Sequence, residues 1–290
     1  MFDRAGIALK TVGEAGPFGQ PSLSADGTRV AVVRNDPETG NQDVWAFDVA
    51  TGRGRAITSD PSADAAPIWS PDGKHVAFVS TRGDYTGIYR KAWNGTGHAE
   101  LLYQHTAGTP SVVLTDWSAD GRFLSFYAGD VLYVLPLDGD RKAVEIERSE
   151  FSTIGGRFSP DARFLAYLSD ESGRYEVYVR PFDSVRDTRG LPLAQPWRVS
   201  PKGAQGMISW RPDGKEIRYL ASDGSFVAVG VTVTPGFQSE TPSVLFRPPS
   251  QGGGGPYTAT GNAVQLRNMN RAGDRFVFAV QPRSTPSSSW

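Results

Sequence analysis

Residues 68–80 read IWSPDGKHVAFVS, a short apolar approach, a tight polar turn and a run rich in β-branched and aromatic side chains. Pro71 fixes φ at the first corner of the turn, Asp72 can accept a hydrogen bond from its own backbone, and Gly73 tolerates positive φ. The run that follows has the period of two that is typical of a β-strand. The stretch therefore predicts two antiparallel strands joined by a tight turn.

The same phrase recurs along the chain, and this repetition decides the fold. Five further copies occupy residues 23–31, 117–126, 158–167, 210–219 and 269–278. The residues expected to shape these turns are Asp26, Gly27, Asp72, Gly73, Asp120, Gly121, Asp161, Asp213 and Gly214. Consecutive copies lie 41 to 59 residues apart, near the period of about 40–50 residues that a propeller blade has. Ala162 stands at one glycine position, where positive φ predicts either a different turn type or strain.

Each of the first five copies is followed by a third strand-like run, such as residues 87–91 or 175–180, and then by a fourth, more polar strand, such as residues 54–58 or 197–200. Four strands per repeat and no helical period predict an all-β fold, a six-bladed β-propeller with four-stranded antiparallel blades, in preference to a β-sandwich. We expect the N-terminal segment to pair with the last repeat and close the ring. The alternative is one incomplete blade. We expect one propeller domain over residues 1–281 and a flexible tail over residues 282–290.

The composition excludes some partners and leaves others open. Lys and Arg number 30 and Asp and Glu number 31, so no basic field favours nucleic acid or an anionic membrane surface. No cysteine is present, which excludes disulfides and thiolate chemistry. Residues 1–10 lack the pattern of a signal peptide, and no run is long enough to span a membrane. We therefore expect a cytoplasmic protein, without direct membrane insertion, that is a monomer.

No sequence pattern of a catalytic or metal site has its required context. The nucleophile elbow, the zinc-peptidase motif, the P-loop and the dinucleotide-binding motif are all absent. Only three histidines occur, His75, His98 and His105, too scattered to predict a zinc site. The turn aspartates could suggest calcium, but one per blade predicts that each serves its own turn. We expect no enzyme activity, no cofactor and no bound metal.

Aromatic residues occupy one repeat position, which precedes the turn by two residues and the turn aspartate by three. They are Trp69, Trp117, Phe158 and Trp210. The same placement in many repeats predicts packing between blades rather than a ligand pocket, because a pocket needs one special position. Burial of such a side chain contributes roughly 1.5–3 kcal/mol by area.

The repeated W-S-P-D-G phrase resembles the WD-repeat-like repeat of TolB-like β-propellers. Longer stretches, residues 36–49, 116–126, 135–142 and 158–182, are similar to the propeller tails of bacterial membrane-anchored serine/threonine protein kinases. The kinase motifs themselves are absent, so the resemblance implies no kinase activity. It implies a sensor or scaffold part in signalling that lies outside the cytoplasm.

Three functions follow as hypotheses. The first is a non-enzymatic binding or scaffold module for a protein or peptide partner. The loops that lead into each inner strand would converge on one face around the channel, with Phe18, Asp64, Thr109, Thr153, Gln205 and Tyr257 as candidate contacts. The second is the regulatory tail of a protein kinase. The third is a propeller hydrolase or lyase, or the gating propeller of a prolyl-oligopeptidase-like peptidase.

Overall fold

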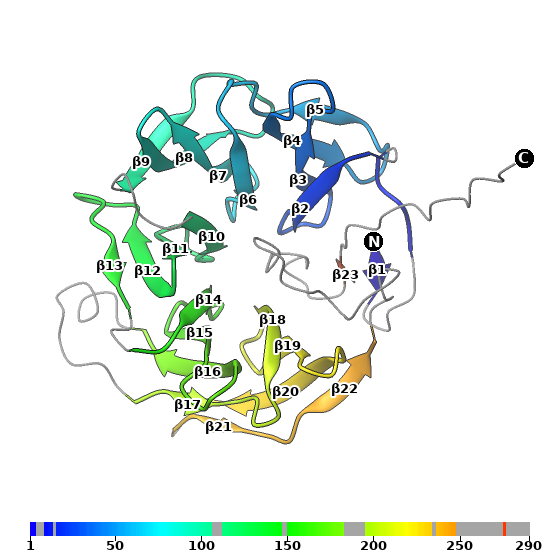
Figure 1. The fold of residues 1–290 in the computed structure, drawn as a ribbon. Helices are drawn as coiled ribbons and strands as arrows, with labels where there is room; N and C mark the ends of the chain where they lie inside the picture. The colour runs from blue at the N-terminus through cyan, green and yellow to red at the C-terminus, as the bar shows by residue number, and fades with distance from the viewer. Residues whose placement is uncertain are drawn as a thin grey trace, which may run out of the picture.

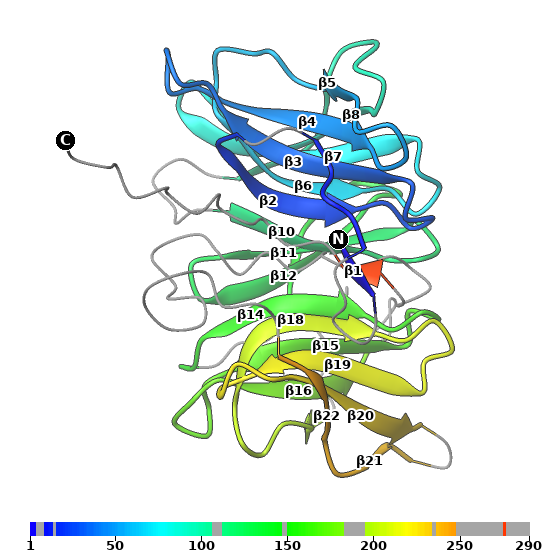
Figure 2. The same cartoon turned by 90° about the vertical axis from the view of Figure 1, so that its right-hand side faces the viewer.

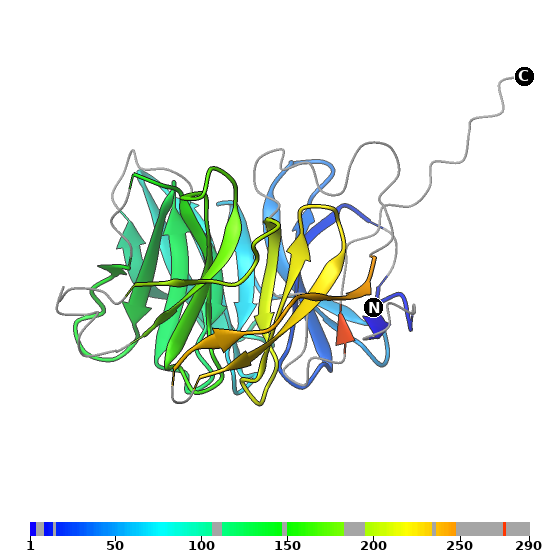
Figure 3. The same cartoon turned by 90° about the horizontal axis from the view of Figure 1, so that it is seen from below.

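The computed structural model describes residues 1–3, 9–13, 16–105, 112–146, 150–182, 195–233, 236–247 and 275–276. In this part of the chain, five antiparallel sheets stand as blades around a central channel (Figure 1). The strands run between the two faces of the ring, as the edge-on view shows (Figure 3). No helix in the described ranges has the length and hydropathy needed to cross a bilayer.

The blades follow one another in sequence, and each begins at the channel. The first blade contains β2 (Phe18–Leu23), β3 (Arg29–Asn35), β4 (Gln42–Asp48) and β5 (Gly54–Ala56). The second contains β6 (Asp64–Trp69), β7 (His75–Arg82), β8 (Tyr85–Ala92) and β9 (Glu100–His105). The third contains β10 (Val112–Trp117), β11 (Phe123–Ala128), β12 (Val131–Pro136) and β13 (Val144–Glu145).

The fourth and fifth blades continue the same order. The fourth contains β14 (Thr153–Phe158), β15 (Phe164–Ser169), β16 (Glu176–Pro181) and β17 (Trp197–Arg198). The fifth contains β18 (Ala204–Trp210), β19 (Glu216–Ala221), β20 (Phe226–Thr232) and β21 (Gln238–Ser239). In this last blade β22 (Ser243–Phe246) also pairs with β20, so the outer edge is shared by two short strands.

The prediction of six blades is wrong: the described residues form five blades, each with four strands in order and the fifth with β22 as an additional strand. The sixth copy of the phrase contributes β23 (Arg275–Phe276), which pairs with β1 (Phe2–Asp3) in a two-stranded sheet. Figure 2 shows this pair between the first and fifth blades. The sixth copy differs from the others in sequence, because the residues that follow it here are rich in Pro and Ser and lack the alternation of a strand. The expected pairing of the N-terminal segment with the last repeat is confirmed.

Neighbouring blades share their hydrophobic cores, and this sharing holds the ring together. One cluster joins Val44 of the first blade to Trp69 and Phe78 of the second. Equivalent clusters join the second blade to the third, the third to the fourth and the fourth to the fifth. The aromatic repeat position is buried, as the sequence predicted, with Trp69 1% and Trp117 5% exposed.

The repeated turns are held by their own side chains. In the second blade the Ser70 hydroxyl donates to Asp72 at 2.6 Å, and the same carboxylate accepts from the Lys74 amide at 3.0 Å. The Asp26, Asp120 and Asp161 turns repeat this arrangement. Each aspartate therefore serves its own turn. Ala162 has a φ of 54° where Gly73 has 68°, so its turn keeps the glycine shape at the expense of strain.

Candidate functional site

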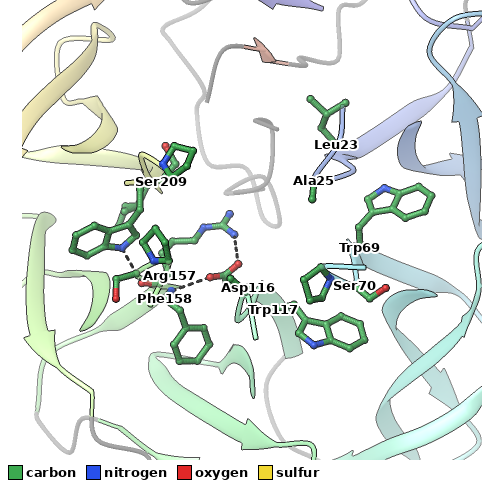
Figure 4. A pocket seen from close by; sticks show the side chains of 16 residues that line it. Leu23, Ala25, Trp69, Ser70, Asp116, Trp117, Arg157, Phe158 and Ser209 are labelled. Atoms are coloured by element: carbon green, nitrogen blue, oxygen red, sulfur yellow. Dashed lines mark hydrogen bonds and ion pairs between the residues drawn. The ribbon is translucent and has the colours of Figure 1, made fainter. Parts of the chain in front are cut away.

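A pocket of about 160 Å³ lies where the five inner strands end at one mouth of the channel (Figure 4). We call this side the turn face, because it carries the repeated turns around Asp26, Asp72, Asp120, Asp161 and Asp213. The opposite side, where the inner strands begin, is the loop face. Every described blade contributes to the pocket wall, for example through Leu23, Trp69, Trp117, Phe158 and Trp210.

Three indoles form much of the apolar wall, and hydrogen bonds fix how they lie. Trp69 Nε1 donates to the Ser22 carbonyl of the preceding blade at 3.0 Å. Trp210 Nε1 donates to the Arg157 carbonyl of its preceding blade at 3.2 Å. Because the polar N–H of each ring is bonded to backbone, what remains for the pocket is apolar surface. The sequence predicted packing for this position. The structure shows that the same residues also line the pocket.

A buried ion pair is the polar part of the pocket. The Arg157 guanidinium lies 3.4 Å from Asp116 Oδ1, and their side chains are 5% and 10% exposed. Asp116 Oδ2 accepts the Phe158 amide at 2.9 Å, and Arg157 also donates to the Thr115 carbonyl. The pair therefore joins the third and fourth blades inside the channel and offers charge of both signs beside an apolar wall (Figure 4).

The sequence prediction did not include this ion pair, although the repeats carry a signal for it. The repeat position immediately before the aromatic residue holds Ser22, Ile68, Asp116, Arg157 and Ser209. Opposite charges in two consecutive repeats stand at the same place on adjacent inner strands, where a propeller brings them together. A comparison of the repeats at that position would have predicted the contact. The pocket also lies on the turn face, whereas the candidate contacts were placed on the loop face.

The described candidates do share the loop face. Phe18, Asp64 and Thr153 are the first residues of β2, β6 and β14, and Gln205 is the second residue of β18. Asp64 and Thr153 are buried, so their side chains belong to the blade interior. Gln205 donates to the Ser222 carbonyl at 2.7 Å. Thr109 and Tyr257 lie outside the described residues. A binding role for this set stays a prediction.

Asp64 has the most perturbed carboxylate on the loop face. Its side chain is 0% exposed, and neither oxygen has a hydrogen-bond partner. Burial raises its pKa to about 6, although the nearby Ser80 and Thr58 hydroxyls and the Arg82 charge lower it. Desolvation also raises the pKa of the neighbouring Asp43. These carboxylates therefore resist ionisation more than an exposed aspartate does.

The arrangement of ionisable side chains does not favour a metal centre in the part of the chain that the structure describes. No group of three or more His, Asp or Glu residues there could hold a metal ion. His105 is buried beside Tyr103, whose hydroxyl lies 3.3 Å from its Nδ1, and burial lowers the pKa of the imidazole. This histidine therefore fits a packing role.

Comparison with known proteins supports a TolB-like propeller. Residues 7–131 match the family model described as the TolB beta propeller domain. A stretch of 75 residues is 35% identical to the Tol-Pal system protein TolB of Francisella tularensis and covers 25% of this chain and 17% of that protein. A stretch of 106 residues is 31% identical to an uncharacterized peptidase, YuxL, of Bacillus subtilis and covers 35% of this chain and 16% of that protein.

Solved structures show the same fold. The structure of TolB from Acinetobacter baumannii matches with a TM-score of 0.57 at 20% identity, over 80% of this chain and 56% of that one. A puromycin-hydrolyzing peptidase of Mycobacterium tuberculosis matches with a TM-score of 0.53 at 20% identity, over 79% of this chain and 38% of that one. The matched stretches span about a sixth of the curated relatives' length.

Proposed function

We propose that this TolB-like propeller is a non-enzymatic binding or scaffold module that holds a protein or peptide partner at the channel pocket of the turn face. The observation that carries the proposal is the convergence of five inner strands on one apolar pocket with a single buried ion pair. Apolar walls with a few placed polar groups are what ligand sites usually offer. The comparison with TolB supports a protein partner for a propeller of this kind.

The size of the pocket limits what can enter it. A cavity of about 160 Å³ is close to the roughly 150 Å³ that accommodates one benzene ring in an engineered protein core. We infer that a partner inserts one apolar side chain, while its backbone spreads over the surrounding turns. Such a central anchor in a desolvated pocket is how hot spots of protein interfaces are built.

Filling the pocket tests the proposal. Peptides selected by display on the immobilised protein would be titrated against the wild type, with tryptophan fluorescence as the readout. Ala119 lines the pocket, and Ala119→Trp should weaken binding at least about tenfold, or about 1.4 kcal/mol. Val244→Trp, on an exposed edge position, is the matched control and should bind as the wild type does. Equal affinity of Ala119→Trp for every selected peptide would place the site elsewhere.

A second candidate function is that of the propeller module of a peptidase. The match to YuxL and the likeness to the puromycin-hydrolyzing peptidase support it. In that case the channel would admit peptide substrates to a catalytic domain. The test is hydrolysis of a panel of chromogenic peptides by the full-length product of the natural gene. Turnover would favour the peptidase, and binding without turnover would favour the scaffold. The kinase-tail hypothesis gains no support from the comparisons.

The proposal also includes where the propeller acts and whether it is a monomer. The Tol-Pal relatives favour the extracytoplasmic alternative over the cytoplasmic expectation. We propose that the propeller acts there as a monomer. Fractionation of cells that carry a tagged chromosomal gene checks the first point, and light scattering of the purified protein checks the second.

A further inference from the structure

The loop face of the first two blades is acidic. Six carboxylates, Asp36, Glu38, Asp43, Asp60, Asp64 and Asp84, stand at the strand ends and loops of this face, against two cations, Arg34 and Arg82. The turn face of the same blades is more balanced in charge, with Arg29, Arg53, Lys74 and Lys91 beside Asp26, Asp48, Asp72 and Glu100. In these two blades the acidic groups are therefore concentrated on the loop face.

Hydrogen bonds draw part of this acidic group into one cluster at the junction of the two blades. Asn41 Nδ2 lies 3.0 Å from the Asp60 carbonyl and 3.4 Å from Asp43 Oδ2. Thr58 donates to Asp43 Oδ1 at 3.2 Å and accepts the Val44 amide at 2.9 Å. Asp64 begins the adjoining strand β6, and the Asp43 charge acts on its carboxylate. We call Asp43, Asp60 and Asp64 the acidic junction.

The buried member of the junction, Asp64, has a carboxylate without a hydrogen-bond partner. Asp64 is 0% exposed, and both of its carboxylate oxygens lack a hydrogen-bond partner. A buried carboxylate without a partner is unfavourable, and a positive charge nearby offsets that penalty. Asp43 and Asp60 are half-buried, so both of these acids are open to solvent.

The two local cations are already engaged. The Arg34 guanidinium lies over the Trp45 ring, 4.5 Å from its centroid. The Arg82 guanidinium lies over the Tyr89 ring at 4.2 Å and 3.7 Å from Asp60. One guanidinium beside three carboxylates leaves the junction with a net negative charge. No described group of acids here has the arrangement of a metal site, so an organic cation fits better than a divalent ion.

We infer that the acidic junction docks a basic segment of a protein partner, with a lysine or arginine side chain beside Asp43 and Asp60. This surface is on the opposite face of the ring from the channel pocket, so it goes beyond the function proposed above. A scaffold with an apolar anchor on one face and a cation-binding junction on the other could hold two partners at once.

A labelled peptide of alternating lysine and glycine tests the inference by fluorescence anisotropy at low salt. The Asp43→Asn/Asp60→Asn double variant keeps an acceptor oxygen at each position and should bind the peptide about tenfold more weakly. Asp138→Asn removes an exposed charge from the turn face and is the matched control. Ala119→Trp should leave this binding unchanged, which separates the inference from the channel-pocket proposal. Equal affinity of the double and control variants would overturn it.

Cross-linking of the wild-type protein to the same lysine peptide supplies a second measurement, which does not depend on the folding of any variant. A carbodiimide joins a lysine amine to a carboxylate that it touches, and peptide mapping identifies the acid. Links at Asp43 or Asp60 are expected, and links confined to turn-face acids such as Asp138 would contradict the inference. A calorimetric titration with calcium chloride alone should give no heat of binding. If the wild type bound calcium tightly and the double variant did not, the junction would be a metal site, and the proposed docking of a basic side chain would be wrong.

Discussion

Asp116 and Arg157 join the third and fourth blades across the channel wall, with Arg157 Nη1 3.4 Å from Asp116 Oδ1. Removing one partner leaves the other charge buried, which typically destabilises a protein by about 3–5 kcal/mol. Asp116→Ala should therefore lower the free energy of unfolding by about this amount in urea titrations. The double variant Asp116→Leu/Arg157→Met should recover most of the loss. Additive losses in the double variant would show that the two side chains are not coupled.

Trp117 supports the pocket wall from the third blade. Its side chain is 5% exposed, and its indole N–H donates to the Gly121 carbonyl at 3.1 Å. Trp117→Ala should reduce stability by about 3–5 kcal/mol, because the cavity cannot collapse against the strands around it. Leu101, 37% exposed, is a control whose change to Ala should have a much smaller effect. An unchanged urea midpoint for Trp117→Ala would remove this residue from the core.

The strained turn at Ala162 offers a test of backbone conformation alone. Its φ of 54° suits glycine, so Ala162→Gly should raise stability by about 0.5–1 kcal/mol. In the reverse change, Gly73→Ala, no atom lies within 4 Å of the added Cβ, so only the φ of 68° is unfavourable for alanine. It should lower stability by a similar amount. Thermal unfolding checks both. A stabilising Gly73→Ala would contradict the conformational explanation.

The Asp64 carboxylate predicts a pH dependence of stability. Its folded pKa of about 6 exceeds its ordinary value of 3.8. Its favourable contribution is therefore complete below pH 3.8 and is lost as the pH rises through about 6. Asp64→Asn should be more stable than the wild type above neutral pH, by about 1–3 kcal/mol, and equally stable near pH 4. Urea titrations across this range check the sign. A difference that shrinks as the pH rises would contradict it.

The blade architecture could be predicted from the sequence because its determinants are local. Asp72 and Ser70 close their turn within five residues, and the same chemistry returns in each repeat. The number of blades could not be read from the turns alone. The sixth phrase supplies only the short strand Arg275–Phe276 of the described structure, because a blade also needs the strand-like runs that should follow its turn.

The site was harder to predict because it depends on contacts between repeats. Asp116 and Arg157 are 41 positions apart and meet only when two inner strands lie side by side. The repeated tryptophans were correctly predicted to be buried, but burial and lining a pocket are not exclusive. The sequence placed Asp64 in a channel-mouth loop, whereas the structure places it at the start of β6, so its burial and its lack of partners required the packed structure.

The proposal that the channel pocket binds the partner is tested most directly by finding which residue of the propeller touches it. A photoreactive phenylalanine analogue would be placed at Ala119 in the channel pocket and, in a separate variant, at Ser172 in an exposed loop of the loop face. Each variant would be irradiated with the peptides selected on the wild type. We expect a cross-link from position 119 and none from position 172. Cross-links from position 172 alone would contradict the assignment of the channel pocket as the binding site.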